Sequence, residues 1–307
     1  LHLSLLSINI KNNDEVIVPS KTFISTANSA LYCNAKPVFC DVDESTFQLD
    51  PLKIEQLITN KTKAIIPVHL GGNICEMNEI KKIAKKYNLI IIEDAAHAHG
   101  STLNGKMAGT LGHIGVFSFY PDKIMASSDG GIVVTNNKKI FEKLLLLRNV
   151  GRKNIGKYDY TEIGYNYRMN EIQAILAQEQ LKLLPKMLKR RREIANIYNN
   201  ELKDIPNLHC QKIVKNVNSA YYSFIMKLTK GNLNKFRKTL KENGIETSPM
   251  FTTIYKTKIY QKLSIFSNNC PISEILDDQT FTIPLHVGIT NTEINYIIKT
   301  IKKILDL

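Results

Sequence analysis

The stretch Val116–Gly131, VFSFYPDKIMASSDGG, decides the fold that this sequence predicts. It continues the short apolar run Ile114–Phe119, which is typical of a buried strand. Tyr120-Pro121-Asp122 then ends the strand, because proline donates no ladder hydrogen bond and disfavours a helical residue before it. We therefore expect Lys123 on a turn just past a core strand, which is where open α/β sheets build their ligand sites.

Lys123 is the candidate reactive group of this turn. A neutral lysine amine is a nucleophile toward carbonyl carbon and can form a Schiff base. The alternative is a surface lysine in a loop, and the chain has 41 Lys and Arg residues, so position alone does not decide between the two. The neighbouring stretches have to decide it.

Short apolar or β-branched runs alternate with helical patterns along the first part of the chain. Thr22–Tyr32 and Asn78–Tyr87 have helical spacing. Besides Ile114–Phe119, strands are expected at Glu15–Pro19, Pro37–Val42, Ala64–Val68, Leu89–Ile92 and Gly131–Thr135. Strands separated by helices need crossover connections, so the sequence predicts an α/β fold with a mainly parallel sheet between helices, formed by a large domain of residues 1–185.

The pattern changes in the second part of the chain, which we interpret as a smaller C-terminal α/β domain, residues 186–307. Two long helices are expected on either side of Pro185, which should interrupt them. The remaining expected elements are a strand and two helices, at Ala220–Leu228, Leu233–Asn243 and Thr290–Leu305.

The composition is that of an ordinary globular protein, with 43% hydrophobic and 22% charged residues and a formal net charge of +13. The basic residues are scattered, so we expect no nucleic-acid partner. No apolar run approaches the ~20 residues that span a bilayer, so no membrane association is expected. The five cysteines form no CxxC pair or metal-ligand pattern, which favours reduced thiols in a cytoplasmic protein and no metal site.

A second key stretch, LIIIEDAAHAHG at Leu89–Gly100, delivers two carboxylates to a strand end. Alternation along a strand sends Glu93 and Asp94 to opposite sides, so only one should face a ligand. Such a carboxylate could balance a cationic ring nitrogen, or it could accept hydrogen bonds from nearby backbone amides. His97 and His99 lack an evident third metal ligand, so we expect a pocket role for His97 and packing for His99.

Five motifs in this order resemble the DegT/DnrJ/EryC1/StrS family of pyridoxal-phosphate-dependent sugar aminotransferases, of the aspartate-aminotransferase fold (fold type I). The resemblance covers nearly the whole chain, and KIMASSDGG is closest to the perosamine-synthase-like branch. The motifs are EVIVPSKTFISTANSALYCNAKPVFCDVD, IIPVHLGG, IIEDAAHAHG, FSFYPDKIMASSDGG and IGYNYRMNEIQAIL.

The resemblance implies a role for each matching residue. Lys123 matches the Schiff-base lysine, and Asp94 matches the carboxylate that pairs with the pyridine nitrogen of pyridoxal 5'-phosphate. His97 matches a residue on one face of the cofactor ring and Phe23 an aromatic residue on the other. The alternative for Phe23 is a packing position in the hydrophobic core.

Two further residues are implied to contact the cofactor phosphate. Ser118 matches a serine whose hydroxyl bonds the phosphate, and Asn166 matches an asparagine that reaches the phosphate of the neighbouring subunit. The resemblance therefore implies a homodimer with shared active sites. The alternatives are a turn hydroxyl for Ser118 and a helix brace for Asn166.

The sequence departs from the family pattern in two places. It begins at Leu1 inside an apparent helix, without the family's Ser/Gly-Thr loop that binds the phosphate, so we expect the N-terminus to be truncated. Ser128 stands where the family usually has glycine, which would be costly if that position needs a positive φ.

The predicted function is amination of a nucleotide-linked keto-sugar, with glutamate as donor, in cell-surface polysaccharide or glycan biosynthesis. The alternative is a truncated or non-catalytic paralogue that pairs with a full-length aminotransferase subunit. A nucleic-acid-binding protein is a weaker third hypothesis, supported by net charge alone. The sequence does not distinguish the nucleotide, the sugar, or amination at carbon 3 from amination at carbon 4.

Overall fold

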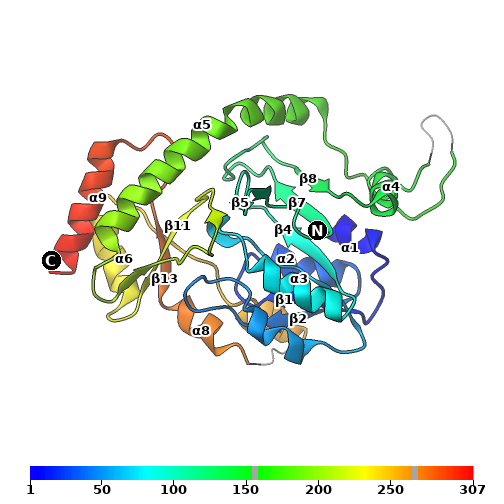
Figure 1. The fold of residues 1–307 in the computed structure, drawn as a ribbon, viewed down its shortest axis with the longest axis horizontal. Coiled ribbons are helices and arrows are strands. Elements are labelled where there is room, and N and C mark those ends of the chain that lie inside the picture. Colours follow the sequence, from blue (N-terminus) through cyan, green and yellow to red (C-terminus); the bar gives the residue numbers. More distant parts are fainter. Residues whose placement is uncertain (154–157, 265–268, 307) are drawn as a thin grey trace.

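The main element of the fold is a six-stranded sheet with the strand order β2-β1-β3-β4-β7-β8 (Figure 1). The computed structural model describes residues 1–153, 158–264 and 269–306. Neighbouring strands are parallel except for β8, which runs antiparallel to β7. The strands are β1 (Glu15–Pro19), β2 (Lys36–Cys40), β3 (Thr62–Ile65), β4 (Ile90–Asp94), β7 (Ile114–Ser118) and β8 (Gly131–Val134). The predicted mainly parallel sheet is confirmed.

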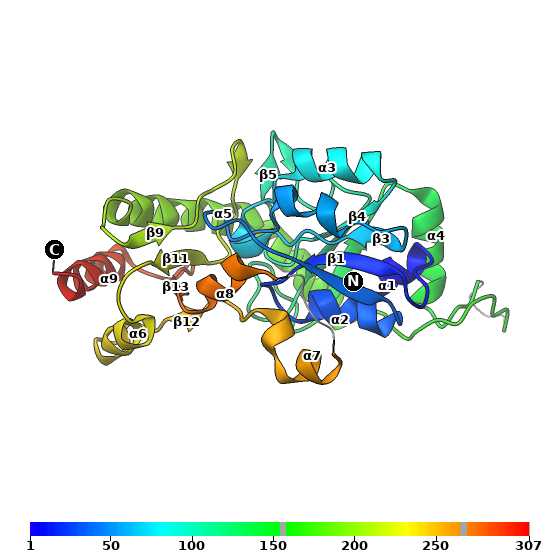
Figure 2. The same cartoon turned by 90° about the horizontal axis from the view of Figure 1, so that it is seen from below.

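Helices cover both faces of this sheet, because its apolar side chains point alternately to the two sides (Figure 2). On one face, Ile91 of β4 packs in one cluster with Ile80 of α3 (Met77–Lys86). On the other face, Ile92 shares a cluster with residues of several helices, three of which come from the first part of the chain. These three helices are α1 (His2–Ser7), α2 (Ser25–Tyr32) and α4 (Lys138–Leu147).

A second, antiparallel sheet has the order β12-β13-β11-β9 and lies at the end of the molecule away from α4 (Figure 1). Its core is shared with the C-terminal half of α5 (Glu171–Leu202) and with α6 and α9. The bounds are β9 (Leu208–Cys210), β11 (Phe224–Leu228), β12 (Ser248–Pro249), β13 (Thr280–Ile283), α6 (Leu233–Glu242) and α9 (Asn291–Ile304). Three short strands form a further small sheet: β5 (Thr102–Leu103), β6 (Lys106–Met107) and β10 (Val217–Asn218).

The predicted interruption at Pro185 is wrong, since α5 is one helix of 32 residues with Pro185 inside it. Leu184 and Leu188, on either side of the proline, are buried together against Ile124 and Ala220. Packing of this kind offsets the cost of a missing helical hydrogen bond.

The segment between β12 and β13 returns to the first sheet, where Ile254, Tyr260 and Cys270 join the core cluster of α1 and α2. This segment carries α7 (Lys258–Lys262) and α8 (Pro271–Asp277). After residue 186 the chain therefore contributes to both parts of the fold: it forms the second sheet, and between β12 and β13 it returns to pack on the first. The division into domains 1–185 and 186–307 stays a prediction.

No helix in the described residues is long and apolar enough to cross a bilayer. Nor does that part of the chain contain a group of three or more His, Cys, Asp or Glu side chains that could hold a metal ion. Cys33, Cys40, Cys75 and Cys210 are free thiols, and the first three of them are buried.

Candidate active site

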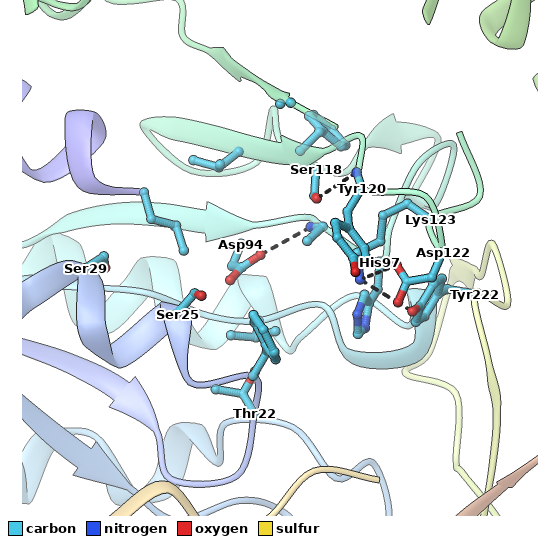
Figure 3. Close-up of a pocket in the computed structure, with 18 of the residues that line it drawn as sticks. Thr22, Ser25, Ser29, Asp94, His97, Ser118, Tyr120, Asp122, Lys123 and Tyr222 are labelled. Carbon is cyan, nitrogen blue, oxygen red and sulfur yellow. Dashed lines mark hydrogen bonds and ion pairs between the residues drawn. The ribbon is translucent and has the colours of Figure 1, made fainter. Parts of the chain in front are cut away.

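A cavity of about 610 Å³ lies at the carboxyl ends of β4 and β7 (Figure 3). Asp94 and Lys123 both line it. The cavity walls come from β4, β7, the loop that joins β7 to β8, and one side of α2. Tyr222 and Phe251, from the second part of the chain, complete the walls. The strand-end position expected from the sequence is therefore where the structure has its cavity.

Lys123 sits on the turn that follows β7, where its backbone amide donates to the carbonyl of Tyr120 at 2.9 Å. Its side chain is 13% exposed, and Nζ lies 3.0 Å from an Asp122 carboxylate oxygen. Nζ is also 3.4 Å from the Tyr222 hydroxyl and 4.7 Å from the centre of the Tyr222 ring. The amine is thus held at the cavity wall by one carboxylate and one aromatic ring.

Asp94 ends β4 with its carboxylate on the α2 side of the sheet. One carboxylate oxygen accepts a hydrogen bond from the Thr26 hydroxyl at 2.8 Å, and the other accepts one from the Ala96 amide at 3.2 Å. A carboxylate has about four acceptor positions, so two hydrogen bonds leave capacity for a further donor. Such a donor would have to come from a group in the cavity.

Glu93 points to the opposite face of the sheet, as strand alternation predicts. It is fully buried and accepts hydrogen bonds from the amides of Gly109, Leu111 and Gly112, and His69 Nε2 lies 2.9 Å away. Burial by itself would raise the pKa of Glu93, but these hydrogen bonds and His69 lower it overall. Glu93 is therefore the structural carboxylate of the pair.

His97 lies in the wall of the cavity and stacks on Tyr222, with ring centres 3.9 Å apart and planes 19° from parallel. Its Nδ1 accepts a hydrogen bond from the Gly71 amide at 3.4 Å, which assigns the ring proton to Nε2. Burial and the charge of Lys123 lower the pKa of His97 well below its usual value. The ring is thus neutral and able to pack against another ring.

His99 behaves as the sequence suggests and packs against Phe117 and Phe119, with ring centres 5.2 and 6.0 Å away. Both of its ring nitrogens are buried without a hydrogen-bond partner in the described residues. Burial lowers its pKa to about 4.

The remaining predicted site residues divide into two groups. Phe23 and Ser118 line the cavity, and the Ser118 hydroxyl accepts from the Tyr120 amide at 3.2 Å, which leaves its own proton free to donate. Asn166 lies on an exposed segment, forms a β-bridge with Asn149, and does not line the cavity of its own chain. The structure therefore brings together five of the six predicted residues.

The structure also adds a detail in the loop between β7 and β8. Ser128 has a φ of +63°, in the left-handed region that favours glycine. Serine at this position therefore carries the conformational cost that the sequence comparison suggested.

Sequence reasoning missed Tyr222 and Phe251 as cavity residues. Tyr222 falls within the expected strand Ala220–Leu228, where an aromatic residue is typical of a core position. Phe251 comes from a loop without a recognisable motif. Both reach the cavity only through long-range packing, for which no local pattern gives a signal.

A lysine amine, a carboxylate at a neighbouring strand end and a ring-sized cavity define a pyridoxal-phosphate enzyme of fold type I. The model of the DegT/DnrJ/EryC1/StrS aminotransferase family matches residues 1–302, and this chain belongs to that family. The predicted family, fold, enzyme class and cofactor are confirmed, because members of the family are pyridoxal-phosphate-dependent aminotransferases.

Two curated relatives show the similarity in sequence. GDP-perosamine synthase of Escherichia coli O157:H7 is 38% identical over 99% of this chain and 82% of its own length. The GDP-perosamine synthase of Caulobacter vibrioides is 36% identical, with 99% and 83% of the two chains covered.

Solved structures show the same similarity in fold. An aminotransferase from Psychrobacter cryohalolentis has a TM-score of 0.94 at 29% identity, over 99% of this chain and 84% of that one. The putative sugar aminotransferase Spr1654 from Streptococcus pneumoniae, in its PLP form, has a TM-score of 0.92 at 27% identity, over the same shares.

Proposed function

We propose that this protein transfers an amino group from glutamate to a nucleotide-linked keto-sugar, in the biosynthesis of a cell-surface polysaccharide or glycan. The observation that carries the proposal is the shared cavity of Lys123 and Asp94. The two perosamine synthases named above support a sugar substrate. The spore coat polysaccharide biosynthesis protein SpsC of Bacillus subtilis, 32% identical over 99% of this chain and 82% of its own length, supports the pathway.

The residues that line the cavity fit pyridoxal 5'-phosphate. Lys123 offers an amine for covalent attachment, and Asp94 has acceptor capacity left for a protonated ring nitrogen. Ser118 can donate to a phosphate, and the buried Thr22 hydroxyl, which has no partner in the described residues, also lines the cavity. When bound, the cofactor supplies an electron sink that stabilises negative charge on the substrate carbon.

The chain's own residues perform the proton transfer and the positioning. The Lys123 amine would take a proton from the glutamate carbon in the first half-reaction and would deliver a proton to the sugar carbon in the second. Asp94 would keep the ring nitrogen protonated by accepting a hydrogen bond from its N–H group. Over the two half-reactions, glutamate becomes 2-oxoglutarate and the amino group replaces the carbonyl oxygen of the sugar.

We further propose that two copies of this chain form a dimer through the N-terminal half of α5 and the segment before it. Large apolar side chains are exposed there, and Ile163 reaches 90% exposure. Those on α5 itself are Ile172, Ile175, Leu176, Leu181 and Leu183. A cluster of exposed apolar residues of this kind marks an interaction surface. Asn166 lies in the segment leading into α5, so a dimer here would carry it toward the partner subunit.

We expect the protein to work in the cytoplasm, where nucleotide-linked sugars and free thiols are both stable. The free thiols of Cys33, Cys40, Cys75 and Cys210 are compatible with a reducing compartment.

The proposed reaction is tested by incubating the cofactor-loaded protein with glutamate and a nucleotide-linked keto-sugar. Both 3-keto and 4-keto sugars, on GDP and dTDP, should be assayed by mass spectrometry of the product. We expect an amino sugar from one of them, with 2-oxoglutarate formed in equal amount. Formation of 2-oxoglutarate without aminated sugar from any of these substrates would contradict the proposed substrate class.

The shared site is tested by hybrid dimers that combine a Lys123→Ala chain with an Asn166→Asp chain. If Asn166 serves the partner's site, each variant alone is inactive, and the hybrid keeps one site with both residues intact. A fully active Asn166→Asp homodimer would contradict the shared site.

A further inference from the structure

Phe251 has a backbone conformation that an aromatic residue rarely adopts. Its φ is +41°, in the left-handed region, where most of the other non-glycine residues of this chain are Asn, Ser or Asp. Strain of this kind persists only where the surrounding structure determines it, and it tends to occur at functional sites. Phe251 is also a wall of the cavity.

A buried ion pair holds this strained residue in place. The ammonium of Lys21, which is 2% exposed, donates to the Phe251 carbonyl at 2.6 Å and to an Asp277 carboxylate oxygen at 2.7 Å. The same Asp277 carboxylate accepts from the Thr253 amide at 2.9 Å, and Lys21 and Thr253 form a β-bridge. Lys21 and Asp277, the last residue of α8, therefore hold the backbone of residues 251–253 by hydrogen bonds.

A similar arrangement holds the other aromatic residue that sequence reasoning missed. Tyr221 has a φ of +47°, and the buried Arg191 of α5 donates to the carbonyls of Tyr221 and Tyr222 at 3.0 and 3.1 Å. Tyr222 then stacks on His97 next to Lys123 (Figure 3). Two buried cations thus each fix a strained aromatic segment against the same cavity.

The two aromatic walls share His97 as a neighbour but differ in their other contacts. Tyr222 stacks on His97 and contacts the reactive amine, whereas the ring centre of Phe251 lies 5.9 Å from those of both His97 and Phe23. Phe23 is 57% exposed, so it marks the solvent side of the cavity. Glutamate and the sugar would both exchange a proton with Lys123, but the nucleotide-linked sugar is much larger and has to extend toward solvent. A wall on the solvent side therefore contacts the sugar more than it contacts glutamate.

We propose that Phe251 determines specificity for the sugar substrate, and that Lys21 and Asp277 are positioning residues that hold its ring in the cavity wall. This inference rests on the proposed function, since it assigns a part of the cavity to the sugar. The pair acts through the Phe251 carbonyl and the Thr253 amide, which set the direction of the backbone between β12 and α7.

The first test is Phe251→Leu, which removes the ring and keeps an apolar side chain. KM for the nucleotide-linked keto-sugar should rise about tenfold, which is the size of a lost pocket contact. The rate of each half-reaction is measured separately. The rate with the sugar should fall about tenfold more than the rate with glutamate. Tyr222→Phe is the matched control, and because its hydroxyl lies next to Lys123, it should affect both half-reactions alike.

The second test is the double variant Lys21→Met and Asp277→Leu, which replaces the ion pair by apolar side chains and leaves no buried charge unpaired. It should reproduce the rise in KM for the sugar, with little change in kcat and with a cooperative thermal transition retained. A wild-type KM in this variant would overturn the positioning role of the pair.

The outcomes separate this inference from the proposed function. If wild-type protein aminates the sugar and Phe251→Leu has an unchanged KM, or alters both half-reactions equally, the inference is overturned alone. If wild-type protein reacts with glutamate but neither aminates nor binds any nucleotide-linked sugar, the proposed function is overturned and the inference with it.

Discussion

The two sides of the β4 carboxyl end carry adjacent carboxylates that have different surroundings. On the α3 side, Glu93 accepts three backbone hydrogen bonds and contacts His69, so its acceptor positions are filled within the protein. On the α2 side, Asp94 has one hydroxyl and one amide as partners and faces a cavity. The comparison shows how a strand end can supply a structural and a functional acid from consecutive residues.

The difference in hydrogen bonding also explains why Glu93 needs no ligand, whereas Asp94 has room for one. A buried charge is costly unless donors surround it. Glu93 meets that requirement with protein groups alone, which fixes the loop of residues 109–112 against the sheet. Asp94 meets it in part, and a cationic ring nitrogen would complete its shell.

The largest expected effect is on the cavity side of the comparison. Lys123→Ala should lower the rate of transamination by about 10⁴-fold or more, because it removes both the covalent attachment point and the proton carrier. Stability should change little, since the Lys123 side chain lies at a cavity wall. The rate is measured by 2-oxoglutarate formation under cofactor saturation, and a rate within tenfold of wild type would remove Lys123 from the mechanism.

The second prediction concerns the structural side. Glu93→Gln should reduce the free energy of unfolding by roughly 3–5 kcal/mol, because the NH2 group that replaces one carboxylate oxygen is a donor and faces the two groups that were bonded to that oxygen. Urea denaturation followed by circular dichroism measures this. Asp94→Asn is the matched control and should lose about 1 kcal/mol. Equal losses of unfolding free energy in the two variants would contradict the distinction between a structural carboxylate and a cavity-facing one.

The third prediction concerns cofactor binding, for which Asp94→Asn should have the large effect and Glu93→Gln the small one. Asp94→Asn should weaken cofactor binding by roughly 10–100-fold, the equivalent of one charge-assisted hydrogen bond. Equilibrium titration with pyridoxal phosphate, followed by absorbance, gives the affinity. Glu93→Gln, examined at a temperature where it is folded, should bind nearly as well as wild type. Tighter cofactor binding by Asp94→Asn than by Glu93→Gln would contradict the assignment.

The smallest effect concerns pH and the histidines that follow Asp94 in the chain. The pKa of His99 is about 4 in the folded protein, below its value of 6.5 in an unfolded chain. The unfolded state therefore binds the proton first, and stability falls as pH drops below 6.5. One such histidine makes the protein about 1.4 kcal/mol less stable at ~pH 5.5 than at ~pH 7.5.

His99→Leu tests this pH dependence, since leucine fills the space between Phe117 and Phe119 and does not titrate. The difference in unfolding free energy between wild type and variant should shift by that amount over the same pH range. A difference that stays constant with pH would show that His99 is protonated equally in the folded and unfolded states.

Much of the first sheet could be predicted from the sequence, because its strands are short apolar runs and its acids follow strand alternation. The expected helix Thr290–Leu305 is also present as α9, which begins at a capping box in which the Thr290 hydroxyl accepts from the Glu293 amide. The interruption at Pro185 was not a reliable prediction, because tertiary packing of Leu184 and Leu188 outweighs the local cost of proline.

The aromatic walls of the cavity could not be predicted for a physical reason. Tyr222 and Phe251 are fixed by Arg191 and Lys21, which lie far away in the sequence and whose buried charges have no local pattern. The sequence pattern could place Asp94 at the end of a core strand and Lys123 on the turn after another, and the resemblance to the family supplied their roles. Sequence periodicity locates strand ends, but it does not show which distant loops close over them.

The most direct test of the account is to trap the lysine that binds the cofactor. The protein is saturated with pyridoxal phosphate and reduced with borohydride, and the modified peptide is identified by mass spectrometry. We expect a pyridoxyl group on Lys123 and on no other lysine. Modification of a different lysine, such as Lys21, or no modification of the saturated protein would contradict the central claim that Lys123 is the reactive amine.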